Sequence, residues 1–294
     1  MSEQQSVAFI GLGVMGYPMA GHLNNAGYSV TVYNRTTTKA VSWVQRYGGC
    51  YAETPAQAVR GASIVFSCVG NDDALRQVML GEGGVSNGLS EGAVIVDHTT
   101  TSADVAKDMA QLFARQGHGF IDAPVSGGQA GAENGRLTVM CGGEADVYRQ
   151  VEPIIQVYAT CVKLLGPSGA GQLTKMVNQI CIAGLVQGLA EGLHFARSAK
   201  LDIAAVVDVI SKGAAQSWQM ENRYQTMIDG DYEHGFAVDW MRKDLGYVLQ
   251  EARNNDSHLP VTMLVDQFYS EVQALGGSRW DTSSLLARLE ALRK

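Results

Sequence analysis

The stretch VAFIGLGVMGYPMAGHL, residues 7–23, decides the fold. A short apolar run leads directly into the pattern G-x-G-x-x-G, and a helical pattern follows. In this context Gly11 permits a tight turn, Gly13 allows the backbone to approach a pyrophosphate, and Gly16 allows the helix to pack closely on the strand. Amides at the N-terminus of such a helix face the anion. The stretch therefore predicts a strand, loop and helix that bind a dinucleotide. The predicted cofactor loop comprises Gly11, Leu12, Gly13, Val14, Met15 and Gly16.

Outward from this loop, β-rich runs alternate with helical patterns as far as about residue 165. Helices are predicted between most of the runs, for example at 15–25 and 103–116. Such alternation builds a doubly wound, mostly parallel sheet with helices on both faces, and its ligand lies at the carboxyl ends of the strands. The predicted strands are VAFIG, VTVYN, SIVFSCVG, AVIVDHT, GHGFIDAPV, LTVMCGG and CVKLLG.

The texture of the sequence changes after GPSGAG, residues 166–171. Beyond it no strand pattern stands out, and apolar residues recur at helical spacing. The first helix is expected to run from about Gly171 to Lys200, roughly 45 Å at 1.5 Å per residue, and to join two domains. We therefore predict an α/β fold with a Rossmann-type NADP-binding domain at 1–165 and an all-helical substrate and oligomerisation domain at 166–294. Further helices are predicted at 202–213, 238–253, 260–274 and 283–293, whereas 214–236 is interpreted as an irregular loop.

Composition limits the partners. The chain has 294 residues, of which 46% are hydrophobic, enough for two cores, and a formal net charge of -7. Its basic residues are scattered singly, so neither nucleic acid nor an anionic membrane is an expected partner. The apolar run at 179–196 is broken by Gln187, Glu191 and His194, and is interpreted as a buried helix rather than a membrane span.

Cysteine and histidine usage bears on compartment and metals. The five cysteines form no C-x-x-C pair and are expected to be reduced and mostly buried, which suits a cytoplasmic protein, as does an N-terminus without a targeting pattern. The six histidines show no metal-ligand spacing, so no metal site is predicted.

The end of the second predicted strand indicates which dinucleotide binds. An acidic residue there would pair with the ribose of NAD, but the sequence has Asn34, Arg35 and Thr36. A guanidinium offers a planar, bidentate donor to a 2′-phosphate, and the two neutral residues add hydrogen bonds. NADP(H) is therefore the expected cofactor, with NAD(H) possible. The alternative is that Arg35 is a solvated turn residue.

Three further motifs carry chemistry. DAPVSGG, residues 122–128, leaves a strand and turns through Ser126, Gly127 and Gly128, which can offer a hydroxyl and backbone amides to a carboxylate. GAGQLTKMVNQ, residues 169–179, places Asn178 and Gln179 three and four residues after Lys175, on the same helix face. DWMRKDL, residues 239–245, puts Lys243 on a later helix.

Together with the glycine loop, these motifs resemble, in their order and separations, the β-hydroxyacid dehydrogenases. This is the family of 3-hydroxyisobutyrate dehydrogenase, tartronate semialdehyde reductase and glyoxylate/succinic semialdehyde reductase, and the resemblance covers nearly the whole chain. It implies an NAD(P)-dependent oxidoreductase acting on CH–OH groups. It further implies a homodimer or homotetramer built by the helical domain, and a cleft in which the nicotinamide meets a short carboxylate-bearing substrate.

The resemblance also implies roles for individual residues. Lys175 matches the catalytic acid/base. Ser126, Gly127 and Gly128 match the substrate-carboxylate loop, and Asn178 matches a substrate-orienting position. Thr100 and Lys243 match residues beside the cofactor. Some members have two asparagines where this chain has Asn178 and Gln179, so either of these two side chains is a candidate for orienting the substrate.

Lysine suits this chemistry independently of the resemblance. Hydride transfer to an aldehyde leaves negative charge on oxygen, and a positioned ammonium can hydrogen-bond that oxygen and donate a proton. The alternatives are a non-catalytic NADPH-binding sensor and an imine reductase; neither requires Lys175. His98 is expected to be a structural histidine. Trp218, Met220, Arg223 and Trp240 either line the far end of the substrate or pack in the helical domain.

Overall fold

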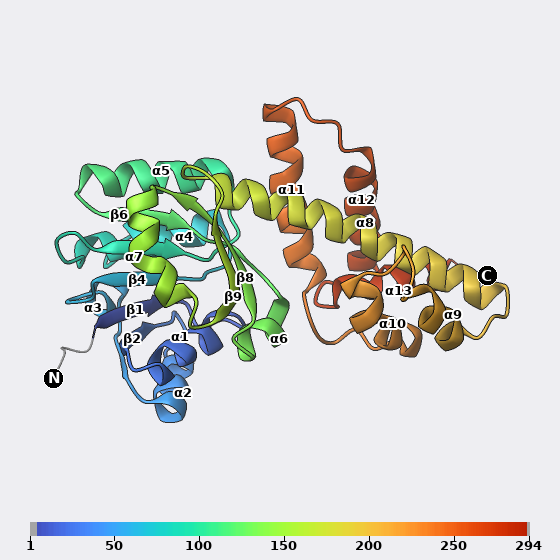
Figure 1. Cartoon of the computed structure of the whole chain (residues 1–294), viewed down its shortest axis with the longest axis horizontal. Coiled ribbons are helices and arrows are strands. Elements are labelled where there is room, and N and C mark those ends of the chain that lie inside the picture. The colour runs from blue at the N-terminus through green and yellow to red at the C-terminus, as the bar shows by residue number, and fades with distance from the viewer. Residues whose placement is uncertain (1–4, 293–294) are drawn as a thin grey trace. The chain divides into compact units, whose positions relative to one another are not determined.

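The computed structural model describes residues 5–292. The chain divides into two compact units, Met1–Lys175 and Met176–Lys294. The division falls inside α8 (Ala170–Ser198), the long helix that the sequence predicted. Figure 1 shows the strands together with helices in the first unit, whereas the elements labelled in the second unit are helices.

The first unit is built on a nine-stranded sheet in the order β3-β2-β1-β4-β5-β6-β8-β7, with β9 paired to β8. Strands β1 to β6 are parallel, and β8 runs antiparallel to β6 and β7. Strand β1 lies between β2 and β4, so the connections leave it in both directions. At such a point the loops after adjacent strands diverge and leave room for a ligand. The strands are β1 (Ser6–Ile10), β2 (Ser29–Tyr33), β3 (Cys50–Tyr51), β4 (Ile64–Ser67), β5 (Val94–Asp97), β6 (Gly119–Asp122), β7 (Val125–Ser126), β8 (Leu137–Gly143) and β9 (Ala159–Leu164).

Each face of the sheet has its own core, because successive side chains of a strand point to opposite faces. Phe9 is in register with Phe66 on β4, and both lie in the core that also buries side chains of α1 (Gly16–Asn25), α2 (Thr37–Tyr47) and α7 (Ala145–Ile155). Ala8, one residue earlier, lies in the other core, with side chains of α3 (Pro55–Ala58), α4 (Asp72–Leu80) and α5 (Ala103–Arg115). The doubly wound fold is thereby confirmed.

The second unit is helical and has a core of its own, to which α8 contributes Ala183, Val186, Ala190 and Leu193. The interpretation of 214–236 as an irregular loop was wrong. Trp218–Asp229 forms a helix whose N-cap, Ser217, accepts a hydrogen bond from the amide of Met220. A serine three residues before a buried methionine is a start signal that the weak apolar periodicity obscured. The helices after α8 are α9 (Ile203–Ile210), α10 (Trp218–Asp229), α11 (Val238–Asn254), α12 (Pro260–Ala274) and α13 (Leu285–Ala291).

Two expectations from composition need correction. By length and composition alone α8 could cross a membrane, so its polar residues do not exclude a span; 44% of its most apolar window is buried in the structure, and core helices meet the same test. Among the cysteines only Cys141 is buried, whereas Cys50, Cys161 and Cys181 are exposed; none of the five forms a disulfide. Cys161 lies within β9 and Cys181 within α8, so a position inside a strand or helix does not by itself make a cysteine buried.

Candidate functional site

The glycine loop connects β1 to α1, as predicted. Gly11 has a φ of +99°, which glycine adopts without strain, and a Cβ there would collide with the carbonyl of Cys68. A Cβ on Gly16 would collide with the carbonyl of Gly11. At Gly13, by contrast, a Cβ would have no atom of the described residues within 4 Å, its two chain neighbours aside. Packing within the chain therefore requires glycine at Gly11 and Gly16 but not at Gly13.

Asn34 is bound inside the protein. Its Oδ1 accepts from the amide of Leu12 at 2.9 Å, and its Nδ2 donates to the carbonyl of Thr36 at 3.0 Å. The Nδ2 group has a second hydrogen, so the prediction that Asn34 contributes a hydrogen bond to a phosphate stays a prediction. Asn34 also ties the glycine loop to the segment that carries Arg35.

Arg35 and Thr36 are exposed at the start of α2. No ion pair joins Arg35 to any described residue, and the Thr36 side chain makes no capping hydrogen bond. Next to them is a cavity of about 780 Å³ that the sequence did not reveal. Its wall comes from the glycine loop and from one side each of α1, α2 and α6 (Gly128–Glu133). The polar lining residues include His22, Thr38, Lys39, Ser42, Arg46, Gln129 and Glu133.

The Ser-Gly-Gly turn follows β7. Ser126 ends that strand, Gly127 has a φ of +128°, and Gly128 has a φ of +61° and begins α6. Both φ values lie in the region that glycine adopts without strain. The chain turns after β7 as the sequence predicted, and the role of this turn in binding a carboxylate stays a prediction.

Asp97, at the carboxyl end of β5, is 1% exposed. Its Oδ1 accepts from the hydroxyls of Ser67 and Thr99, each at 2.7 Å, while its Oδ2 has no hydrogen-bond partner among the described residues. Burial raises the pKa of Asp97 to about 7, although the hydrogen bonds from Thr99 and Ser67 oppose the shift. Thr99 in turn accepts from the amide of Val69, so the ends of β4 and β5 are joined beside Thr100.

His98 has a structural role, as expected. One ring nitrogen pairs with the carbonyl of Ala123 at 2.6 Å and the other with the hydroxyl of Tyr158 at 2.8 Å. Its ring also stacks on Phe66. Burial lowers the pKa of His98 to about 4, so this histidine is neutral near pH 7.

Asp122, at the end of β6, holds the start of α8. Its Oδ1 accepts from the amide of Gly169 at 2.7 Å, and its Oδ2 accepts from the amide of Gln172 at 3.0 Å. Burial raises the pKa of Asp122 to about 6, while these backbone hydrogen bonds oppose the shift. Lys175 follows one helical turn later and is 7% exposed. Neither Asp122 nor Gln172 was recognised from the sequence as part of the site, although both lie within motifs quoted for other residues.

Within the second unit, polar residues of α8 and α11 form a chain. Asn178 donates to Oε1 of Gln179 at 2.8 Å, and Gln179 donates to Asp244 at 2.6 Å. Lys243 pairs with Asp244 at 3.2 Å and lies over the rings of Trp240 and Tyr247. Because Gln179 is 2% exposed and engaged at both ends, the structure favours it as a support for Asn178, not as a group that contacts substrate.

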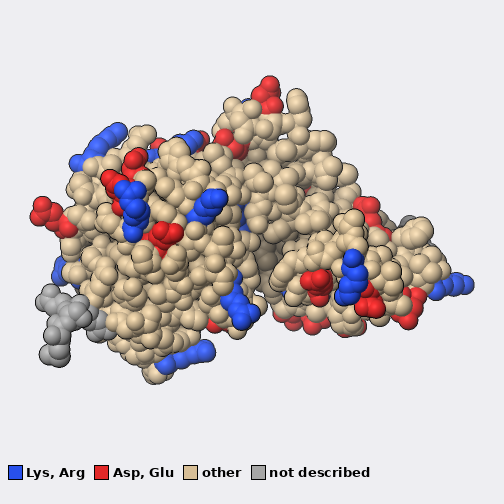
Figure 2. All heavy atoms as spheres, in the orientation of Figure 1, with Lys and Arg blue, Asp and Glu red and all other residues tan. Residues whose placement is uncertain are grey.

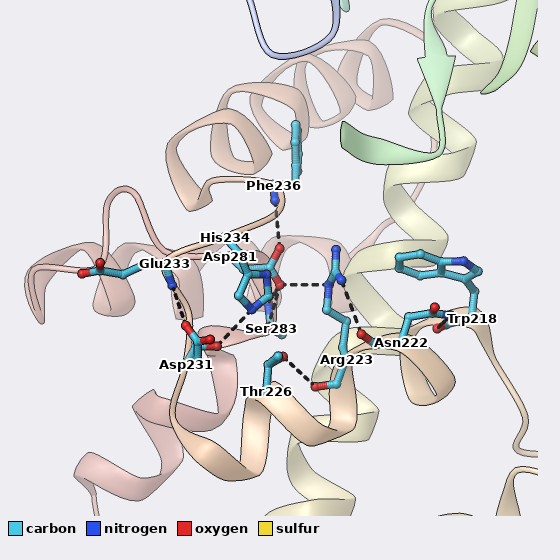
Figure 3. Close-up of polar contacts among 10 residues, drawn as sticks. All are labelled: Trp218, Asn222, Arg223, Thr226, Asp231, Glu233, His234, Phe236, Asp281 and Ser283. Atoms are coloured by element: carbon cyan, nitrogen blue, oxygen red, sulfur yellow. Dashed lines mark hydrogen bonds and ion pairs between the residues drawn. The ribbon is translucent and has the colours of Figure 1, made fainter. Parts of the chain in front are cut away.

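Figure 3 shows the surroundings of Arg223 in the second unit. The guanidinium pairs with the buried carboxylate of Asp281 at 3.3 Å and lies 5.0 Å from the ring of Trp218. Asp281 also accepts from the amides of Phe236 and Ser283, so the pair organises the chain around α10. Met220 belongs to the helical core. Of the residues considered for the far end of a substrate, Trp218 and Trp240 are the exposed ones.

The described residues include no group of three or more His, Cys, Asp or Glu side chains that could hold a metal ion. On the face drawn in Figure 2, basic and acidic side chains are scattered among each other.

Comparison with known proteins gives concordant results over almost the whole chain. Residues 6–166 match the family model described as the NAD binding domain of 6-phosphogluconate dehydrogenase. Residues 169–289 match the model described as NAD-binding of NADP-dependent 3-hydroxyisobutyrate dehydrogenase.

Individual proteins are similar over the same length. An uncharacterized oxidoreductase of Shewanella frigidimarina is 68% identical over 98% of this chain and 99% of its own. The 2-hydroxy-3-oxopropionate reductase of Escherichia coli is 33% identical over 97% of each. The crystal structure of 3-hydroxyisobutyrate dehydrogenase from Salmonella typhimurium superposes with a TM-score of 0.87 at 27% identity, covering 97% of this chain and 99% of that one.

Proposed function

The chain belongs to the NAD(P)-dependent 3-hydroxyisobutyrate dehydrogenase family, which acts on CH–OH groups, and on that premise we propose that it is an NADPH-preferring reductase of short aldehyde acids. The proposed substrates are the semialdehyde and glyoxylate class, with 3-hydroxyisobutyrate-like acids in the oxidative direction. The observation that carries the proposal is the buried Lys175 on α8, in a chain that also has the glycine loop and the Ser-Gly-Gly turn.

The residues of the first unit fit a dinucleotide phosphate. Helix α1 begins at Gly16, and the dipole at its N-terminus favours an anion. Tyr17 and Met19 donate to the carbonyls of Gly13 and Met15, and Pro18 has no amide hydrogen, so backbone donors to a phosphate would come from the glycine loop and not from these three residues. Packing within the chain does not require a glycine at position 13. The glycine there is explained if a ligand approaches the backbone, which supports the proposal. Arg35 is exposed and without an ion pair among residues 5–292, which supports a role in binding the 2′-phosphate of NADP(H). Thr100, beside the joined ends of β4 and β5, and Lys243 are the further proposed cofactor residues.

The turn at Ser126, Gly127 and Gly128 is the proposed site for the substrate carboxylate. Its two glycines with positive φ form a turn whose amides are candidate donors to a carboxylate, and the serine hydroxyl adds a donor. Asn178 is proposed to orient the substrate, with Gln179 and Asp244 holding its amide. A carboxylate held in this way would favour acid substrates over neutral aldehydes.

Lys175 is the proposed general acid/base. The bound nicotinamide would supply or accept the hydride. In reduction, the Lys175 ammonium hydrogen-bonds the aldehyde oxygen and donates a proton to it as negative charge develops. In oxidation, the neutral amine accepts the hydroxyl proton.

Two alternatives predict different outcomes. A sensor would bind NADPH without turning over, and would not need Lys175 together with the Ser-Gly-Gly turn. An imine reductase would act on neutral imines without Lys175. The exposed apolar side chains of α8, at Val177, Leu185 and Phe195, support a homo-oligomer.

The test is an assay of NADPH and NADH oxidation with a panel of short aldehyde acids, matched neutral aldehydes and a cyclic imine. The proposal expects turnover of at least one aldehyde acid, faster with NADPH and faster than its neutral analogue. NADPH binding without turnover of any aldehyde would identify a sensor, and turnover confined to the imine would identify an imine reductase.

A further inference from the structure

Gln172 makes an unusual connection for a residue in the first turn of a helix. It is completely buried, and its amide pairs with the backbone that follows β5. Nε2 donates to the carbonyl of Thr99 at 2.7 Å, and Oε1 accepts from the amide of Thr101 at 3.0 Å. The side chain thus satisfies a donor and an acceptor on either side of Thr100, as a neighbouring strand would.

The backbone of the same turn is fixed from β6. Asp122 accepts from the amides of Gly169 and Gln172, so the first turn of α8 is held by two strand ends at once. The first turn of α8 packs tightly against the end of β6, since a Cβ on Gly171 would lie 2.6 Å from the carbonyl oxygen of Asp122. Any change in the Gln172 amide therefore has to be absorbed by the Thr99–Thr101 segment or by the helix.

We propose that Gln172 is a positioning residue for the reaction, because its amide sets the placement of Lys175 relative to Thr100. The inference rests on the proposed function, in which Lys175 exchanges the proton and Thr100 lies beside the cofactor. Lys175 comes three residues after Gln172, about 4.5 Å along the helix axis. Proton transfer needs the donor within hydrogen-bond reach of the substrate oxygen, and a misplacement of about 1 Å can cost on the order of 100-fold in rate.

A charge-switch variant tests this directly. In Gln172→Glu, one carboxylate oxygen still accepts from the Thr101 amide, but the other faces the carbonyl oxygen of Thr99 and repels it. When the introduced carboxyl group is protonated, its hydroxyl can donate to that carbonyl and restore both contacts. At high pH we expect the kcat of Gln172→Glu to be about 10- to 100-fold lower than that of the wild type. The ratio of the two kcat values should rise as pH falls.

Gln172→Met provides the comparison, since it keeps the length of the side chain and removes both hydrogen bonds. Its kcat ratio should be low at every pH, with NADPH affinity little changed. Four titratable groups lie in or beside this turn: Asp122, Asp97, Lys107 and Lys175. They are present in the wild type and in both Gln172 variants, so the part of their titration that the substitution leaves unchanged cancels in the ratio. Gln187→Met is the matched control: it also places a methionine at a buried glutamine of α8, and it should leave the kcat ratio near 1.

A Gln172→Met enzyme with wild-type kcat would overturn the inference. So would a Gln172→Glu enzyme whose ratio does not rise at low pH, and this readout remains if Gln172→Met does not fold. Lys175→Ala distinguishes failure of the proposed mechanism from failure of the positioning role of Gln172. If Lys175→Ala keeps its activity, the proposed mechanism fails; if Lys175→Ala is inactive and Gln172→Met is normal, only the positioning role fails.

Discussion

Strands β2, β5 and β6 end at the same edge of one sheet. The polar residues at the ends of β5 and β6 are buried, whereas those that follow β2 are exposed. Asp97 and Asp122 are buried; Asp97 accepts a hydrogen bond from Ser67 on β4, and Asp122 accepts one from the amide of Gln172 on α8. Arg35 and Thr36 are exposed beyond the end of β2. Polar groups that are fixed inside the protein set geometry, whereas exposed ones are available to a ligand. The comparison predicts that substitutions at the two places change different quantities.

The largest effect is expected at the helix that the fixed edge positions. Lys175→Ala should lower kcat by about 10²- to 10⁴-fold, the range typical of a general acid/base, with NADPH affinity little changed. Lys175→Arg should restore little, because a guanidinium does not release its proton near neutral pH. Stopped-flow turnover and NADPH fluorescence titration measure the two quantities separately. Near-normal kcat in a folded Lys175→Ala protein would assign the proton to another group.

The sequence predicted the strand, turn and helix of the glycine loop, but it did not reveal most of the residues that fix the neighbouring strand ends. The loop could be predicted because the spacing G-x-G-x-x-G after an apolar run is typical of this local structure. The role of Arg35 stays a prediction. Gln172 was visible within GAGQLTK, but its partners lie 71 and 73 residues away, and nothing local indicates that pairing. The two-residue strand β7 was missed for a similar reason: it exists through pairing with β8, which no periodicity over two residues can reveal.

The glycine loop contains the same contrast within a few residues. Gly11→Ala should lower the free energy of unfolding by about 3 kcal/mol, since it combines a φ of +99° with a collision against the carbonyl of Cys68. Gly13→Ala should leave that free energy within about 0.5 kcal/mol of wild type, and should weaken NADPH binding. Denaturant unfolding and a binding titration on both variants measure the difference. Equal destabilisation by the two would mean that Gly13 also serves packing.

Substitution of the exposed Arg35, beyond the end of β2, should change the preference between NADPH and NADH without changing stability. Arg35→Ala removes a charge-assisted contact worth about 2 kcal/mol, so the preference in kcat/KM for NADPH over NADH should narrow by roughly 30-fold. Thermal stability should not change, because Arg35 is exposed and forms no ion pair with a described residue. Lys39→Ala is the control, because Lys39 is another basic residue of the adjoining cavity. It shows whether loss of any positive charge there narrows the preference for NADPH over NADH. An unchanged NADPH/NADH ratio in the Arg35 variant would make that arginine a solvated turn residue.

The smallest expected effect, and the most specific to the fixed edge, concerns Asp97. Its pKa is raised from 3.8 to about 7 by burial, so between these two values the folded protein binds more protons than the unfolded chain. The free energy of unfolding should therefore fall as pH rises from about 4 to about 7, and level off above that range.

Asp97→Asn removes this titration, while its Oδ1 can still accept from Ser67 and Thr99. The new Nδ2 donor takes the place of an oxygen without a partner, and a buried unpaired donor has its own cost, so the net change near pH 7 should be only on the order of 1 kcal/mol. The slope is the diagnostic: denaturant unfolding at several pH values should show a shallower decline in the variant, with the remaining slope attributable in part to Asp122, whose pKa is raised to about 6. Parallel curves for the two proteins would show that Asp97 does not take up a proton on folding in this range.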